Sequence, residues 1–153
     1  MNHARTVTNE SPNYKWKAFL AMSLGTFLCA ASASIVNIAL PFLGEHFRVD
    51  LALLEWVVIA YLIVISSTLL IYGRMGDMYG HKPVYVAGLV IFTFGSLLCG
   101  IAGSIETLIG CRLLQGIGAG MVMAIGSAIL ASSFPPTERG KAMGMIGMVV
   151  AMA

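Results

Sequence analysis

Four long stretches without a charged residue constrain the fold of this chain more than any other feature. They cover residues 18–44, 56–73, 83–105 and 113–137. A helix needs about 20 apolar residues to cross a hydrocarbon core of about 30 Å. Because these stretches are apolar on every side, we expect them to face lipid or other helices rather than water. The predicted membrane spans are 18–43, 51–72, 83–103 and 107–132.

Composition supports an integral membrane protein and excludes other classes. Hydrophobic residues make up 58% of the chain and charged residues 10%, against about 25% charged in soluble domains. A net charge of only +2 argues against a nucleic-acid partner. Cys29, Cys99 and Cys111 lie in apolar runs without ligand spacing, so we interpret them as buried thiols. The sequence has no nucleophile–base pair, phosphate loop or metal-ligand cluster, so we expect no enzyme, no metal site and no cofactor.

The two ends of the chain differ from the spans. The last apolar run, Ala142–Ala153, would rise only about 18 Å as a helix, which is too little to cross a membrane. We therefore expect a fifth helix to begin within 141–153 and the chain to be part of a longer protein. Residues 1–17 are expected to form a polar tail. A cleaved secretory signal is the alternative there, but its apolar core is usually about 7–15 residues, and this run continues to Leu43.

Basic residues predict the orientation in the membrane. With four spans, seven of the nine basic residues lie on the side of the N-terminus, which the positive-inside rule assigns to the cytoplasm. These seven are Arg5, Lys15, Lys17, Arg74, Lys82, Arg139 and Lys141. We expect a multi-pass protein of the plasma membrane. Its short connections predict that consecutive helices are antiparallel neighbours.

Arg112 is the main polar anomaly within the predicted spans. A charge there costs several kcal/mol unless it faces a wet cavity or a partner, and the alternative is a side chain that reaches outward to the interface. Gln115 follows on the same helical face. Small residues spaced four apart let helices approach closely, as in Gly116 with Gly120, and again in Gly140 with Gly144 at the start of the fifth helix. We expect the fourth span to line a central pathway.

The connection Gly73–Pro83 places Asp77 near the basic residues Arg74, His81 and Lys82. Its glycines allow tight turns and close helix contact, and a proline suits the first turn of the next helix. A plain polar turn on the wet side of the membrane is the alternative.

Asn37 and Pro41 interrupt the first span near its outer end. A proline tends to kink a helix, and an asparagine can donate hydrogen bonds across helices in a bundle. A tolerated kink with a satisfied amide is as good an interpretation as a substrate contact.

At these residues the chain resembles the major facilitator superfamily of secondary transporters. Gly73, Asp77, Gly80 and Lys82 match its loop signature Gly-x-Leu-Ala-Asp-Arg-x-Gly-Arg-Lys. Arg112, Gln115, Gly116, Gly118 and Ala119 match the fourth-span signature Arg-x-x-Gln-Gly-x-Gly-Ala of the proton-driven antiporters. Ser34–Pro41, with Asn37, is similar to the first-span signature Thr-Ile-Val-Asn-Val-Ala-Leu-Pro of the fourteen-span drug:proton antiporters. The resemblance covers about residues 15–153.

The resemblance implies a fold and a set of roles. The chain would form part of an N-terminal six-helix bundle in a carrier of 12 or 14 spans. Asp77 would belong to an inner-side charge network that steadies the outward-open state. Gly73 and Gly80 would allow the second span to approach a helix of the second half. Arg112, with Gln115, would face the central cavity and influence proton coupling.

Three positions depart from the family pattern. The acid of the first span is replaced by Ser32, the loop arginine by Met78, and the next motif arginine by His81. Without an acid in the first span, a proton carrier is expected elsewhere in the protein. Because histidine titrates near neutral pH, we also hypothesise that its pairing with Asp77 is lost as the cytosolic pH rises.

The sequence thus predicts part of a secondary transporter, a proton-coupled exporter of drugs or metabolites that works by alternating access. Its partners would be the lipid bilayer, a small amphipathic substrate, protons and the remaining C-terminal helices. One alternative is a complete four-span exporter that works as a homodimer, although it would need an acid deep in a span. The other is a non-transporting membrane adaptor that pairs through its glycine faces, although an adaptor has no need of Arg112.

Overall fold

The computed structural model describes residues 12–134 and 136–153, and its regular elements there are all helices. They are α1 (Pro12–Phe47), α2 (Leu51–Tyr79), α3 (His81–Gly100), α4 (Ile105–Ser133) and α5 (Pro136–Ala151). Helices α1 to α4 are long and apolar enough to cross a membrane. The predicted all-α membrane class is confirmed, and each predicted span overlaps one of these four helices.

The helix ends differ from the predicted ones at several places. α1 begins at Pro12, so the predicted tail 1–17 is helical in its last part, while residues 1–11 lie outside the described residues. α3 ends at Gly100 rather than at 103, and α5 begins at Pro136 rather than near 141. A proline at the start of a helix loses no intrahelical hydrogen bond, and Glu138 in the first turn of α5 complements the helix dipole.

The predicted loop after the second span is mostly helix. α2 continues through Tyr79 and α3 begins at His81, so Gly80 alone separates them. Gly80 has a φ of 93°, which glycine adopts without the strain that a side chain would bring. The prediction of tight turns at the other glycines is wrong, because Gly73 and Gly76 lie inside α2. Pro83 falls in the first turn of α3, as predicted.

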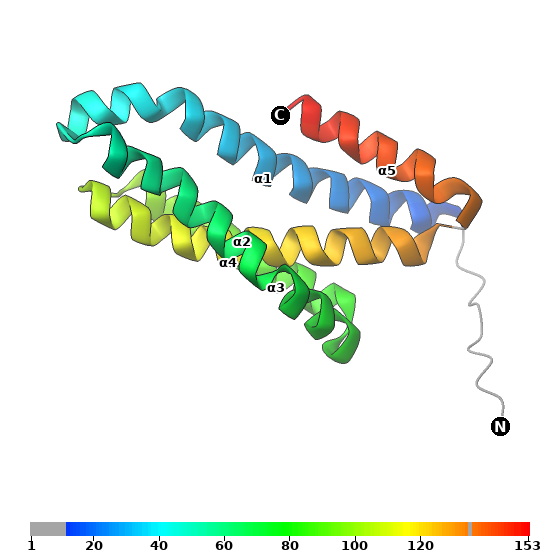
Figure 1. The fold of residues 1–153 in the computed structure, drawn as a ribbon. Helices are drawn as coiled ribbons and strands as arrows, with labels where there is room; N and C mark the ends of the chain where they lie inside the picture. Colours follow the sequence, from blue (N-terminus) through cyan, green and yellow to red (C-terminus); the bar gives the residue numbers. More distant parts are fainter. Residues whose placement is uncertain (1–11, 135) are drawn as a thin grey trace.

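α4 is the central helix of the bundle. Successive helices run in alternating directions, and α5 lies beside α1 (Figure 1). The most extensive contacts, however, are those of α4 with α3 and with α2, while α2 touches its sequence neighbours α1 and α3 much less. Consecutive helices are therefore antiparallel neighbours, as expected, and the chief partner of α2 is the non-consecutive α4.

Glycines on two faces of α4 and on α3 explain this arrangement. On one face, a Cβ added to Gly116 or to Gly120 would lie 3.1 Å from atoms of α2. On the other face, a Cβ on Gly118 would clash with the backbone of α3, and one on Gly95 of α3 would lie 2.8 Å from the Cα of Gln115. Both neighbours therefore approach α4 to backbone distance, as small residues permit in membranes.

Two apolar clusters flank a polar middle along α4. One contains Leu54, Val57, Ile105 and Leu108. The other includes Met22, Tyr85, Val122, Ile125 and Leu130. Arg112 and Gln115 lie between Leu108 and Val122 on α4, and both are buried. The fold therefore encloses these two polar side chains between two blocks of packed hydrophobic residues.

Candidate functional site

Arg112 is buried in the bundle and hydrogen-bonded inward. Its side chain is only 4% exposed. Its Nη1 donates to Oε1 of Gln115 at 2.6 Å and to Oγ of Ser32 at 3.2 Å. The interpretation of an arginine that reaches outward to the interface is therefore wrong. Its polar partners lie one turn along its own helix and across on α1.

Gln115 connects α4 to α1 and α3. Its Nε2 donates to Oγ of Ser32 at 3.0 Å and to Oγ of Ser96 at 2.6 Å. Ser96 in turn donates to the carbonyl of Phe92 one turn back in α3, and the Sγ of Cys99 lies 4.0 Å from Oε1 of Gln115. The amide thus uses both of its ends, which a buried polar side chain needs in order to avoid a desolvation penalty.

Tyr61 of α2 completes the surroundings of Arg112. The guanidinium carbon lies 5.6 Å from the centre of the Tyr61 ring, within the distance of a cation–π interaction. The Tyr61 hydroxyl donates to the carbonyl of Cys29 at 3.5 Å. We call Ser32, Tyr61, Ser96, Arg112 and Gln115 the arginine network. It joins α1, α2, α3 and α4, so a shift of α1 or α2 changes the contacts of Arg112, and a shift of α3 changes those of Gln115.

The first span contributes Ser32 to this network, two residues before its motif Ser34–Pro41, and the motif residues themselves lie outside the network. Ser34 is half-buried, whereas Asn37 and Pro41 are exposed on a face that the described helices leave uncovered. α1 continues through Pro41 to Phe47. Since a proline cannot donate to the carbonyl four residues earlier, the carbonyl of Asn37 loses its helical partner. No hydrogen bond of the Asn37 side chain is found within residues 12–134 and 136–153.

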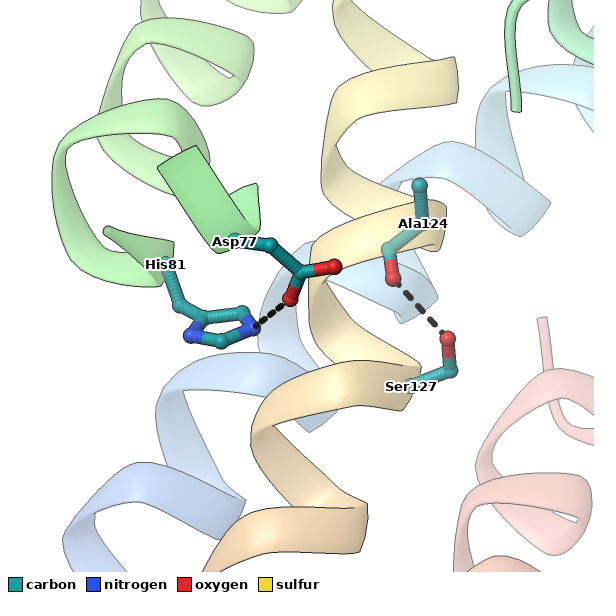
Figure 2. A network of polar contacts seen from close by, with 4 residues as sticks. All are labelled: Asp77, His81, Ala124 and Ser127. Atoms are coloured by element: carbon teal, nitrogen blue, oxygen red, sulfur yellow. Dashed lines mark hydrogen bonds and ion pairs between the residues drawn. The ribbon is translucent and has the colours of Figure 1, made fainter. Parts of the chain in front are cut away.

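The second group of predicted residues lies at the α2–α3 turn. Nε2 of His81, at the start of α3, lies 3.7 Å from Oδ1 of Asp77, which is four residues earlier in the last turn of α2. Figure 2 shows these two side chains turned toward each other across the turn. Among the residues that the structure describes, Asp77 makes no ion pair with Arg74 or Lys82. Lys82 is exposed in the first turn of α3.

A shallow hollow between α2 and α4 adjoins this turn. It is lined by Leu69, Leu70, Gly73, Arg74, Asp77, Ala124 and Ser127. The Ser127 hydroxyl donates to the carbonyl of Ala124 in its own helix at 2.9 Å, so it does not bond Asp77 (Figure 2). A Cβ on Gly73 would meet no atom within 4 Å, whereas one on Gly76 would clash with Ile125 of α4. Gly73 therefore presents an open surface, and Gly76 is the glycine that packs.

The glycines of α5 behave like Gly73. A Cβ on Gly140 or Gly144 would meet nothing within 4 Å. The described helices therefore give no packing partner to this small-residue pair, unlike Gly116, Gly118 and Gly120. The expected role of Gly140 and Gly144 in helix contact stays a prediction.

Two members of the arginine network, Tyr61 and Ser96, received no functional interpretation from the sequence, and Ser32 was noted only as a departure from a motif. A polar or aromatic hydroxyl inside an apolar run is a signal that could have marked Tyr61 and Ser96. Their meeting with Arg112 depends on close packing between helices that lie far apart in sequence.

Comparison with known proteins agrees with the resemblance seen in the motifs. The sequence model of the Major Facilitator Superfamily matches residues 22–153. The chain is 39% identical over 136 residues to riboflavin transporter RibZ of Clostridioides difficile, covering 89% of this chain and 30% of the relative. It is 36% identical over 137 residues to multidrug resistance protein 3 of Bacillus subtilis, covering 88% of this chain and 26% of the relative.

A third relative is efflux pump FUS6 of Gibberella fujikuroi, with 35% identity over 138 residues that cover 90% of this chain and 25% of the relative. The chain thus spans at most about a third of the length of these curated relatives. The family model covers most of the chain, and four helices can span a membrane. This multi-pass membrane chain belongs to the Major Facilitator Superfamily.

Proposed function

We propose that this chain is the N-terminal part of a secondary active exporter of small amphipathic molecules that is driven by the proton gradient. Membership of the family points to transport rather than to enzyme catalysis. The relatives named a riboflavin transporter, a multidrug resistance protein and an efflux pump support a small-molecule substrate. Their greater length supports a carrier in which further helices complete the central pathway.

The arginine network is the observation that carries this proposal. A buried cation contacted by side chains from α1, α2 and α4 has partners whose positions depend on how those helices are arranged. In alternating access, two bundles rock around a site near the middle of the membrane. The contacts of Arg112 and Gln115 would change during that movement, and this change would couple the movement to substrate and proton binding. The proton carrier itself would lie in another part of the whole protein.

The α2–α3 turn would form the inner gate in this proposal. The exposed Asp77, its neighbour His81 and the open surface at Gly73 are available to a helix from the second half of the carrier. The basic residues on this side favour a cytoplasmic location of the turn and of the N-terminus. We place the protein in the plasma membrane.

Efflux from vesicles tests the proposal. The whole protein in everted membrane vesicles should accumulate at least one dye of an amphipathic panel that includes Hoechst 33342 and the carboxylate fluorescein when a proton gradient is imposed, and an uncoupler should abolish the uptake. Uptake that persists with the uncoupler would overturn proton coupling, and absence of uptake for a broad panel of amphipaths would overturn export. Vesicles that contain residues 1–153 alone should show no uptake, whereas a complete four-span exporter would be active.

A further inference from the structure

The positive charge of Arg112 has no counter-charge among the residues that the structure describes. Six acids fall in this part of the chain: Glu45, Asp50, Glu55, Asp77, Glu106 and Glu138. All six are exposed, and none forms an ion pair with Arg112. The partners of Arg112 are a hydroxyl, an amide oxygen and an aromatic ring. A buried charge with neutral partners alone is unusual, because burial strongly disfavours an unpaired ion.

One edge of the guanidinium is also unused. Both of its hydrogen bonds come from Nη1. Its Nε is buried and has no hydrogen-bond partner in the described structure. Arginine presents its Nε and Nη2 donors as a planar fork that matches the two oxygens of a carboxylate. The free edge is therefore suited in shape and charge to a planar monoanion.

The network reaches the surface of the bundle at Ser32. Leu28 and Ile35, one turn before and one turn after Ser32 on the same face of α1, are 44% and 64% exposed. Ser32 itself is only half-buried. A small outward movement of α1 at this point would uncover the guanidinium at Nη1, which Ser32 contacts.

From the unpaired charge, the free donor edge and this opening, we infer that the arginine network is an anion site whose ligand is a carboxylate group of the substrate. This inference rests on the proposed export function and names the substrate class as amphipathic carboxylates. Ser32 is the position that makes the site available. An acid at this position would lie beside Nη1 and would neutralise Arg112 from within the chain.

Thermal unfolding with a matched pair of probes tests the anion site without requiring transport. The whole protein, purified in detergent, is unfolded in benzoate and in benzamide at equal concentration and constant ionic strength. The two probes share a ring and differ in charge. A ligand that binds only the folded state raises its stability, so we expect a reproducibly higher Tm in benzoate than in benzamide. Equal Tm values would overturn the inference, because they would mean that Arg112 is already neutralised or inaccessible.

A matched pair of variants ties the effect to this site. Ser32→Asp supplies a fixed carboxylate and should remove the difference between benzoate and benzamide, whereas the equally sized, neutral Ser32→Asn should keep it. A difference that survives in Ser32→Asp would place anion binding elsewhere and overturn the assignment.

A second pair covers the case in which Ser32→Asp does not fold. Arg112→Lys should keep part of the benzoate effect and Arg112→Gln should lose it, and an effect retained in Arg112→Gln would contradict the inference. If vesicles transport amphipaths but the protein has the same Tm in benzoate and in benzamide, the anion site is wrong and the export function stands. If the Tm is higher in benzoate than in benzamide but nothing is transported, the export function is wrong and the anion site stands.

Discussion

Gly118 offers the sharpest test of the packing that assembles the arginine network. A Cβ at this position would clash with the backbone nitrogen of Phe92 and would lie 2.8 Å from its Cα and 2.7 Å from the carbonyl oxygen of Gly88. All three obstacles are backbone atoms, so no side-chain rotation relieves them. Gly118→Ala therefore requires α3 and α4 to separate.

The size of that separation follows from the contact distances. Ordinary contact for a Cβ begins at 3.4 Å, so the Cα of Phe92 must move by at least 0.6 Å from its distance of 2.8 Å. Overpacking of this kind costs about 1–3 kcal/mol, occasionally more. It also pulls Ser96 away from Gln115, whose hydrogen bond of 2.6 Å joins the same two helices. We expect Gly118→Ala to lower both the stability and the transport rate.

Gly110 provides the matched control on the same helix. A Cβ there would meet no atom within 4 Å, and alanine is favoured over glycine in a helix by about 0.5–1 kcal/mol. In thermal unfolding of the whole protein in detergent, Gly110→Ala should unfold at or above the wild-type Tm, while Gly118→Ala should unfold several degrees lower. Equal Tm values for the two variants would refute the close backbone packing of α3 on α4.

Three further predictions concern the network, the turn and the topology. Gln115→Leu should lower the free energy of unfolding by about 1–3 kcal/mol, because a buried donor of Arg112 loses its acceptor. The control in thermal unfolding is the isosteric Gln115→Glu, which keeps an acceptor and adds a counter-charge, and a Gln115→Leu variant as stable as wild type would contradict a structural role of the network. His81→Arg should flatten the dependence of transport on pH between about 6 and 8, because arginine keeps its positive charge beside Asp77 throughout that range; an unchanged pH profile removes this idea. Cysteines introduced at Arg48 and Lys82 in a cysteine-free background should react with an impermeant maleimide from outside and inside the cell respectively, and the reverse pattern would contradict the proposed orientation.

The sequence was sufficient for the helices because their signal is local. An apolar run long enough to span a membrane has few alternatives to a helix, since each backbone donor and acceptor needs a partner within the segment. Helix ends were less predictable, as the α2–α3 turn illustrates: Gly73 and Gly76 looked like turn residues, yet the helix continues to Tyr79 and only Gly80 leaves it. Glycine is tolerated in a membrane helix when it serves packing, as Gly76 does against Ile125.

Some residues of the site could likewise be predicted from their local sequence, whereas others depend on contacts between distant segments. Arg112 and Gln115 stand out in the sequence because a charge and an amide are rare inside a span. Ser32 and Ser96 are ordinary residues there, and they acquire a role only because α1 and α3 both pack close enough to Gln115 to accept from its Nε2. That packing depends on the glycine pairs of α3 and α4, whose registry no single stretch of sequence specifies.

The initial rate of gradient-driven dye uptake in everted vesicles tests most directly whether Arg112 works in transport. We predict that Arg112→Gln, present in the membrane in the same amount as wild type, loses most of this rate, and that Gly110→Ala retains it. An Arg112→Gln variant that transports at the wild-type rate would contradict the assignment of the arginine network as the working site of the carrier.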